Sequence, residues 1–373
     1  MAPIRVLHEN VILDPGGIEA MIMNIYRNID REKVQFDFLL HRDTKGFYDD
    51  EVKELGGRIY IAPPFNPFHH RRYLKGTDKI IKEHPEYKVI HAHSELNLWP
   101  LKIAKKHGVS TRISHSHNAK TTVNLKYFFF LYEKLFIKKN CTDMFMCSTP
   151  AGEWTYGKKA VRDGKCVFIK NGIVVDDYKY NPKIREKVRK DLNLGDSFVV
   201  GHVGRYMQQK NHTFLIDIFN EILKIRPNSK LVSVGDGRLI DETIQKAQDL
   251  GITDKILFLG NRNDVKELLQ GFDCFLFPSL WEGLPVTGVE AQSAGLPVIM
   301  SDVITDEVIV TDLVKTMPLK ATAREWAKAV IEKVDSTERK DVSQQVKESG
   351  FDIKTTAKWL ENFYLERYGI KDE

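Results

Sequence analysis

The chain has 373 residues, enough for two domains that each bury a sizeable core. Its 42% hydrophobic and 29% charged residues are ordinary for a globular protein and exclude a disordered chain, and no apolar run reaches the ~20 residues of a membrane span. The net charge of +5 is unevenly distributed along the chain. Residues 1–175 hold 28 Lys and Arg against 19 Asp and Glu, while residues 176–373 hold 28 Lys and Arg against 32 Asp and Glu. This difference predicts different partners for the two halves.

Short apolar runs alternate with helical stretches along the whole chain. In the first half the expected strands are Ile4–Glu9, Phe36–His41, Arg58–Pro63, Val89–Ser94, Arg112–His117, Asp143–Ser148 and Cys166–Lys170. In the second half they are Val199–Arg205, Lys230–Gly235, Ile256–Gly260, Cys274–Ser279, Pro297–Asp302 and Val314–Leu319. Strand alternating with helix predicts parallel sheets with covered faces, and these runs are too many for one ordinary open sheet. We therefore expect an α/β protein of two doubly wound domains, whose ligands bind beyond the carboxyl ends of the strands.

The boundary between these domains is expected near Asn171-Gly172-Ile173, where a strand ends and a turn signal follows. Tyr178–Pro182 then has the character of a linker. The last segment, residues 355–368, is amphipathic, with Trp359 and Phe363 on one helical stripe.

The first strand leads into a turn with Gly16 and Gly17, and then into a helix. Glycines let the backbone approach a phosphate closely. The turn lacks the Gly-x-Gly-x-x-Gly spacing of a dinucleotide site. A phosphate-binding turn and a purely structural turn both fit this sequence.

Histidines end two other strands of the first half, at His91-x-His93 and at His115-Ser116-His117. A histidine in such a place can share a proton at neutral pH. Alternation along a strand puts the two histidines of each pair on one face, but no carboxylate or thiol completes a ligand set. We therefore expect hydrogen-bonded histidines here and no metal site.

Arg205 ends the first strand of the second half, and Lys210 follows on the same loop. Together the two cations can neutralise a diphosphate, although they can equally be two solvated surface charges.

The stretch from Pro278 to Glu290 leads from a strand through a turn into a helix. Pro285 suits the first helical turn, and the free N–H groups there attract an anion. Glu282 on the loop and Glu290 on the helix can each accept bonds from paired hydroxyls, so this region fits a ligand with both phosphate and polyol character. No Asp-x-Asp occurs in the chain, which disfavours a metal-chelated nucleotide diphosphate.

Aromatic residues stand beside cations in His69–Lys75 and Tyr127–Lys139 of the first half. This pattern favours a bilayer interface with anionic lipid, while a core helix with a solvated basic end is the alternative for the second stretch. Nucleic acid is not an expected partner, because no recognition module occurs.

Met1-Ala2-Pro3 leads at once into a strand, so we expect no signal peptide. Cys147 and Cys166 are expected to be buried free thiols, as in a reducing cytosol. We therefore expect the protein to be cytoplasmic, or peripheral on the inner face of the plasma membrane.

Glu282–Glu290 resembles the Glu-x7-Glu motif of the retaining glycosyltransferases of family four, which have the GT-B architecture. The resemblance continues through Ala291–Val298, and Ser301–Glu307 is similar to bacterial exopolysaccharide and capsule glycosyltransferases. The family's other motifs occur in order and cover nearly the whole chain: Gly16-Gly17-Ile18-Glu19, Asn171-Gly172-Ile173, Gly204-Arg205 with Lys210-Asn211, and Pro278-Ser279.

This resemblance implies two Rossmann-like domains that face a central cleft. Residues 1–172 would bind the acceptor and residues 173–354 the nucleotide-sugar donor. A C-terminal helix over residues 355–373 would cross back to the first domain, as Trp359 and Phe363 indicate.

The resemblance also implies residue roles. Arg205 and Lys210 would hold the diphosphate, Glu282 the donor sugar and Glu290 the ribose. His117 would lie near the reacting centre, with His115 as the alternative. The other implied donor-binding residues are Gly16, Gly17, Gly283, Leu284, Pro285 and Val286 for the sugar and phosphates, and Asn261 and Arg262 for the base. Val174 stands where many relatives carry an acidic residue, so no role is assigned to that turn.

The implied function is retaining, metal-independent transfer of a hexose from a nucleotide-diphosphate sugar, with UDP as the expected nucleotide. The acceptor would be a saccharide or a lipid-diphosphate-linked saccharide in bacterial surface polysaccharide synthesis. No metal or other cofactor is expected. Two alternatives stay open: a GT-B sugar-nucleotide epimerase, which needs no acceptor, and a non-catalytic partner in a polysaccharide assembly complex.

Overall fold

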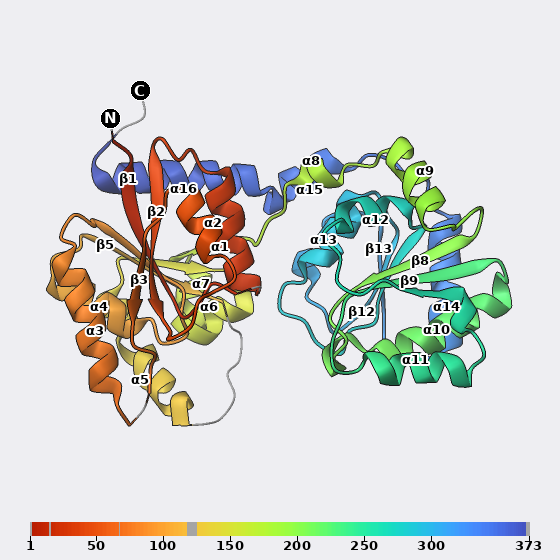
Figure 1. Ribbon diagram of the computed structural model, residues 1–373, viewed down its shortest axis with the longest axis horizontal. Coiled ribbons are helices and arrows are strands. Elements are labelled where there is room, and N and C mark those ends of the chain that lie inside the picture. The colour runs from red at the N-terminus through yellow and green to blue at the C-terminus, as the bar shows by residue number, and fades with distance from the viewer. Residues whose placement is uncertain (1, 15, 67, 118–124, 371–373) are drawn as a thin grey trace. The chain divides into compact units, whose positions relative to one another are not determined.

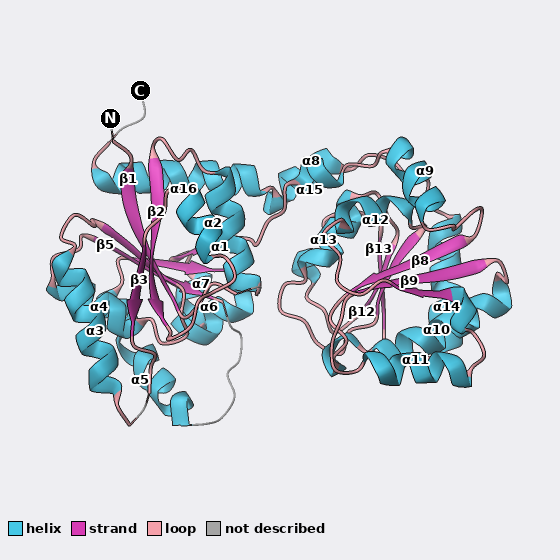
Figure 2. Ribbon diagram, in the orientation of Figure 1, coloured by secondary structure: helices cyan, strands magenta, loops and turns pink. Residues whose placement is uncertain are grey.

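The computed structural model describes residues 2–14, 16–66, 68–117 and 125–370. The chain divides into two compact units, each with its own sheet (Figures 1 and 2). The first unit comprises Met1–Gly172 and Ile353–Glu373, and the second comprises Ile173–Asp352.

The first unit contains a seven-stranded parallel sheet with the order β3-β2-β1-β4-β5-β6-β7. Its strands are β1 (Ile4–Asn10), β2 (Val34–His41), β3 (Ile59–Ala62), β4 (Val89–Ala92), β5 (Thr111–Ser116), β6 (Asp143–Met146) and β7 (Cys166–Phe168). Each coincides with an expected run. The pairing is parallel throughout, as alternating strands and helices predict.

Helices cover both faces of this sheet (Figure 2). They are α1 (Gly17–Asn28), α2 (Asp49–Glu54), α3 (His70–Glu83), α4 (Leu98–Lys106), α5 (Leu125–Asn140), α6 (Thr149–Tyr156), α7 (Lys158–Arg162) and α16 (Ile353–Tyr368). Because side chains alternate along a strand, Leu7 and Ile90 pack with α3, α4 and α5, whereas the neighbouring His8 and His91 face away from that cluster.

The last helix, α16, packs against α1 and on β1, β2 and β4 of the first unit (Figure 1). The rings of Trp359 and Phe363 lie 5.9 and 5.4 Å from the ring of Phe145. The Tyr364 hydroxyl lies 2.7 Å from His91 Nδ1. The prediction that the C-terminal helix returns to the first domain is confirmed.

The second unit contains a six-stranded parallel sheet with the order β10-β9-β8-β11-β12-β13. Its strands are β8 (Phe198–Val203), β9 (Ser229–Val234), β10 (Ile256–Phe258), β11 (Cys274–Phe277), β12 (Val298–Ser301) and β13 (Val314–Met317). All six match expected runs, so the prediction of two Rossmann-like domains is confirmed.

Two hydrophobic clusters, one on each face, hold the second sheet between its helices. The helices are α8 (Val175–Tyr178), α9 (Pro182–Asp191), α10 (His212–Ile225), α11 (Ile240–Asp249), α12 (Val265–Gly271), α13 (Val286–Ser293), α14 (Ala323–Asp335) and α15 (Ser343–Val346). Short 3-10 turns η1 (Gln208–Lys210), η2 (Thr253–Lys255) and η3 (Asp306–Val308) and a π-helix η4 (Lys347–Phe351) complete the unit.

Two sequence expectations need correction in detail. Cys147 and Cys166 form no disulfide but are only half-buried, since Cys147 directly follows β6 and Cys166 begins the edge strand β7, and of the four cysteines Cys274 is buried. Tyr178 ends α8 and does not belong to a linker. Among the described residues, no helix combines the length and the apolar character that a bilayer crossing requires.

Candidate functional site

The loop between β11 and α13 brings Glu282 to two side chains of the η1 turn. Lys210 Nζ lies 2.8 Å from Glu282 Oε1, and Gln209 Nε2 donates to Oε2 at 2.9 Å. The Leu280 N–H also donates to the Gln209 carbonyl at 2.8 Å, which ties the two loops together. The side chains of Lys210 and Glu282 are 14% and 6% exposed, so this is a largely buried ion pair. The sequence singled out both residues, and the structure brings them together.

Arg205 lies on the same loop but has no counter-charge. Its side chain is exposed, and it makes no hydrogen bond or ion pair with the described residues. A Cβ on Gly204 before it would lie 3.0 Å from His202 Nε2 and 3.1 Å from Lys210 Cδ, so a larger residue would crowd both side chains. Gly235 has φ +136°, and a Cβ on it would lie 2.2 Å from the Gly204 carbonyl oxygen. The close packing of Gly204 and Gly235 therefore fixes the backbone of the loop that carries Arg205 near the Lys210 side chain.

Helix α13 begins beside Glu282 without a side-chain cap. Pro285 is its N-cap residue, one position earlier than expected, because the helix itself starts at Val286. A Cβ on Gly283 would meet no atom within 4 Å, so the backbone of this turn is open to a ligand. Thr287 Oγ1 has no hydrogen-bond partner among the described residues. The turn offers N–H groups and partial positive charge to an anion.

Glu290 lies one turn further along α13 and accepts a hydrogen bond from the Tyr178 hydroxyl at 2.8 Å. Burial raises the pKa of Glu290, and the bond from Tyr178 opposes that shift. Burial and the neighbouring Glu290 carboxylate raise the pKa of Tyr178. Tyr178 is therefore a partner of the candidate residue Glu290 that sequence reasoning missed, since it lies more than a hundred positions from Glu290 and carried no motif of its own.

Asn261 and Arg262 lie on an exposed loop after β10. Arg262 forms two bonds to Asp264, at 2.7 and 2.6 Å, so its charge is paired. The loop adjoins the glycine turn, because the Gly235 N–H donates to the Gly260 carbonyl at 2.8 Å. Among the described residues, no hydrogen bond or ion pair joins Asn261, Arg262 or Glu290 to the Lys210–Glu282 pair.

In the first unit, Gly16 is the N-cap residue of α1 and Gly17 its first residue. A Cβ on Gly16 would lie 2.4 Å from Glu19 Oε2, whereas a Cβ on Gly17 would meet no atom within 4 Å. Asn10 Nδ2 donates to Glu19 Oε1 at 3.1 Å, and Asn171 Nδ2 to the Gly17 carbonyl at 3.3 Å. The Gly17 backbone is thus held in place while its outer side stays open.

Five histidines meet at the carboxyl end of the first sheet. One chain runs from His117 Nε2 to His93 Nδ1 at 3.0 Å, and from His93 Nε2 to His8 Nδ1 at 3.0 Å. A second runs from His115 Nδ1 to His91 Nε2 at 3.1 Å, and from His91 Nδ1 to the Tyr364 hydroxyl at 2.7 Å. His8 was not expected here, since no motif marks it; only the parallel pairing of β1 with β4 brings it to His91 and His93.

Burial lowers the pKa of His8 and of His117 to about 3, and Asp37 partly opposes the shift of His8. Burial, together with the other histidines, lowers the pKa of His91, His93 and His115. The cluster is therefore neutral near pH 7. His117 is half-buried while His115 is 1% exposed, so His117 is the more accessible of the two candidates. A cavity of about 20 Å³ lies beside them, and its lining includes Ser94 and Thr155.

Comparison with known proteins places both halves of the chain in glycosyltransferase families. Residues 184–349 match Glycosyl transferases group 1, and residues 15–177 match Glycosyltransferase Family 4. The chain is 32% identical over 370 residues to EpsF of Bacillus subtilis strain 168, which is named as a glycosyltransferase, with 96% of each chain covered.

It is also 29% identical over 322 residues, 80% of each chain, to an Escherichia coli enzyme named UDP-Gal:alpha-D-GlcNAc-diphosphoundecaprenol alpha-1,3-galactosyltransferase. Among solved structures, HepE from Anabaena in complex with UDP superposes with a TM-score of 0.78 at 18% identity, covering 97% of this chain and 100% of that one. At that identity the likeness establishes a shared fold.

Proposed function

This chain belongs to the GT-B glycosyltransferases of group 1 and family 4, and we propose that it transfers a hexose with retention from a UDP-sugar to a saccharide or lipid-linked saccharide. The product would be part of a bacterial surface polysaccharide. This proposal rests on the charged site of the second unit, which consists of the unpaired Arg205, the Lys210–Glu282 ion pair and the uncapped start of α13.

This charged site matches what a departing nucleoside diphosphate requires. Breaking the glycosidic bond leaves negative charge on the diphosphate, and preorganised donors and cations stabilise such charge as it develops. Arg205 and the α13 turn are available for the phosphates, and Lys210 can exchange its bond to Glu282 for a phosphate oxygen. Glu282, once released from Lys210, can accept bonds from sugar hydroxyls. Because these cations supply the positive charge and no Asp-x-Asp occurs, we propose that the transfer needs no metal.

Glu290 and Tyr178 form the part of the site that we assign to the ribose. A carboxylate accepts bonds from two neighbouring hydroxyls, and the bond from Tyr178 fixes its orientation. UDP as the nucleotide is supported by the UDP complex of HepE and by the UDP-Gal donor in the name of the Escherichia coli relative. We assign the base to the loop of Asn261 and Arg262.

At the acceptor side we propose that His117 lies near the reacting centre. Its neutral ring can accept a hydrogen bond from a hydroxyl or donate one, and the bond to His93 fixes its orientation. Retention requires the acceptor to attack the face from which the diphosphate leaves. The departing phosphate can then take the proton of the attacking hydroxyl.

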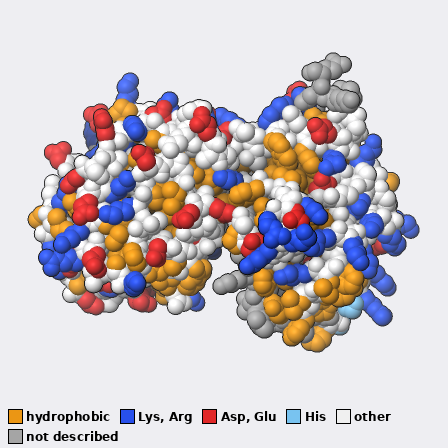
Figure 3. All heavy atoms as spheres, turned by 180° about the vertical axis from the view of Figure 1, so that it is seen from behind, with side chains coloured by type: hydrophobic (Ala, Val, Ile, Leu, Met, Phe, Trp, Pro, Cys, Tyr) orange, Lys and Arg blue, Asp and Glu red, His pale blue; other side chains and the backbone are white. Residues whose placement is uncertain are grey.

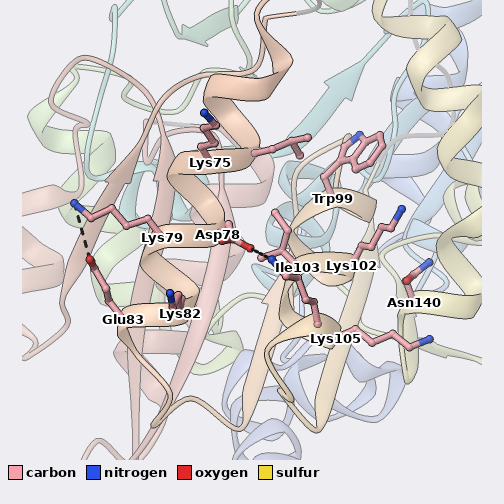
Figure 4. A pocket seen from close by; sticks show the side chains of 12 residues that line it. Lys75, Asp78, Lys79, Lys82, Glu83, Trp99, Lys102, Ile103, Lys105 and Asn140 are labelled. Carbon is pink, nitrogen blue, oxygen red and sulfur yellow. Dashed lines mark hydrogen bonds and ion pairs between the residues drawn. The ribbon is translucent and has the colours of Figure 1, made fainter.

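A lipid-linked acceptor is supported by a basic and aromatic surface on the first unit, and we propose that this surface contacts an anionic membrane from the cytoplasmic side. A groove of about 1030 Å³ lies between α3 and α4, and Figure 4 shows Lys75, Lys79, Lys102 and Lys105 around it. On α5, Phe128 and Leu135 are 64% and 72% exposed. In Figure 3 a hydrophobic patch adjoins Lys and Arg side chains on this unit. Such surfaces bind anionic lipid through charge and buried apolar area.

The test is a turnover assay with a panel of sugar nucleotides and saccharide acceptors, in the presence of EDTA. The proposal expects transfer or slow hydrolysis of at least one UDP-sugar, with the anomeric configuration retained, and loss of turnover in Glu282→Ala but not in Glu242→Ala, an exposed control on α11. Conversion of the donor to an isomer without acceptor would identify an epimerase. Binding without turnover across the panel would identify a non-catalytic partner.

A further inference from the structure

Contrary to the expectation from the sequence, we propose that His93, His115 and His117 form a binding site for a transition-metal ion of the Zn²⁺ class in the first unit. Each of these histidines offers a ring nitrogen, and the three nitrogens lie within 4.8 Å of one another. The register of β4 and β5 pairs Ala92 with Ser114, so that His93 and His115 follow side by side, and His117 comes two residues later. The alternation that puts the histidines on one face is also what brings them together.

The surrounding bonds orient these rings for a metal. A histidine that binds a metal through one nitrogen donates the N–H of the other nitrogen to a partner, which fixes the tautomer. His115 Nδ1 has such a partner in His91, which continues to Tyr364, and His93 Nε2 has one in His8. His115 is 1% exposed, and its Nε2 has no hydrogen-bond partner among the described residues. A buried ring nitrogen without a partner fits a metal ligand.

The distance between two of the three ligand nitrogens also agrees with a metal site. Two imidazole nitrogens bound to Zn²⁺ at about 2.0–2.1 Å in a tetrahedron are roughly 3.3 Å apart. His93 Nδ1 and His117 Nε2 are 3.0 Å apart, so a shift of a few tenths of an ångström would admit the ion in place of their hydrogen bond. The adjoining cavity of about 20 Å³ can hold a water molecule as a fourth ligand, since Ser94 and Thr155 line it.

A second triplet, His8, His91 and His93, also brings ligand nitrogens within reach of one another. Its three side chains are each 2% exposed, and His91 is bonded through both ring nitrogens, to Tyr364 and to His115. The triplet of His93, His115 and His117 is favoured as the metal site because it borders the cavity and includes the half-buried His117.

The metal would act as an inhibitor of transfer and not as its cofactor. This consequence rests on the proposed function, because it assumes that His117 serves the reacting centre. An ion bound to His117 Nε2 would replace the bond to His93 that orients this ring toward the acceptor, so Zn²⁺ would lower turnover while EDTA restored it. Metal binding itself does not depend on this assumption and is measured without donor or acceptor.

The experiment uses the full chain without an affinity tag. Zn²⁺ binding is measured by calorimetric titration and by metal content after gel filtration, and the ligands are identified from the visible spectrum of the Co²⁺ form. Variants His117→Ala and His115→Gln are compared with His69→Ala, an exposed histidine of the same unit outside the cluster. His117→Ala is the gentler change because that side chain is half-buried, and melting temperatures without metal identify any variant that fails to fold.

We expect one Zn²⁺ per chain, a tetrahedral Co²⁺ spectrum without thiolate bands, and a melting temperature that rises with added Zn²⁺. Folded His117→Ala and His115→Gln should bind more than about 100-fold more weakly, while His69→Ala should match the wild type. Absence of stoichiometric binding to the wild type, thiolate bands in the Co²⁺ form, or full binding by folded His117→Ala would overturn the proposal. If Zn²⁺ binds as expected but does not inhibit an active enzyme, the role of His117 in transfer is wrong and the metal site stands.

Discussion

The two units share one fold but carry different chemistry at the carboxyl ends of their strands. In the first unit the strands end in histidines whose pKa values are lowered by burial, so the cluster is neutral. In the second unit the loops carry charge, with Lys210 paired to Glu282 and Arg205 unpaired. A sheet of this kind fixes only where side chains gather. The residue types then differ, with neutral histidines that share hydrogen bonds in the first unit and charged side chains in the second.

The largest effect should come from removing the unpaired cation of the second unit. Arg205→Ala should lower kcat for transfer by about 10²–10³-fold, because one preorganised donor to developing charge is worth about that much. The measurement is steady-state kinetics, with Arg324→Ala on the exposed side of α14 as the control. If Arg205→Ala retained full activity, stabilisation of the phosphate charge by this cation would not distinguish the second unit from the first.

Acid should destabilise the first unit more than the second. His8 and His117 have a folded-state pKa of about 3, whereas an unfolded histidine titrates near ~6.5. The unfolded state therefore binds more protons between these values, so stability is complete above pH ~6.5 and is lost as the pH falls, by about 1.4 kcal/mol per pH unit for each such histidine. The second unit has two histidines with lowered pKa, His202 and His212, against five in the first.

Hydrogen exchange at pH 7.5 and 5.5 would measure this difference strand by strand. Protection should fall more in β1, β4 and β5 than in β8, β9 and β11. Equal losses in the two sheets would contradict the contrast drawn from the histidine cluster.

A smaller effect is expected from Tyr178→Phe in the second unit. This change removes the hydroxyl that bonds the Glu290 carboxylate, and a hydrogen bond to a charged group contributes about 1.5 kcal/mol, or roughly tenfold in affinity for UDP. Tyr180→Phe is the matched control, because the Tyr180 ring packs under Arg339 and its hydroxyl makes no hydrogen bond with the described residues. Equal affinities of the two variants would remove Tyr178 from the nucleotide site.

The smallest effect concerns the outer surface of the first unit. Lys102→Ala should weaken binding to vesicles with anionic lipid about fivefold, because each lysine near such a surface contributes about 1 kcal/mol. Co-sedimentation would compare it with Lys328→Ala on the second unit, and neutral vesicles should bind neither protein. If the two variants weakened binding equally, the membrane surface would not belong to the first unit.

The strands could be predicted well from the sequence, because buried parallel strands are short apolar runs between helical stretches. Arg205, Lys210, Glu282 and Glu290 could be named because they stand in contiguous motifs. His8 and Tyr178 could not, since each acts through a partner far along the chain that only the folded pairing brings near. Pro285 precedes the expected first turn by one position, because its ψ of 101° is extended and makes it the N-cap residue.

The central claim is that the second unit holds a nucleoside diphosphate with its own cations. Calorimetric titration of the protein with UDP in the presence of EDTA tests it most directly. We expect one site per chain, an affinity unchanged by added Mg²⁺ or Mn²⁺, and binding at least about tenfold weaker in Arg205→Ala and Lys210→Ala than in Arg324→Ala. Binding that requires a divalent cation, or that is the same in all three variants, would contradict the account.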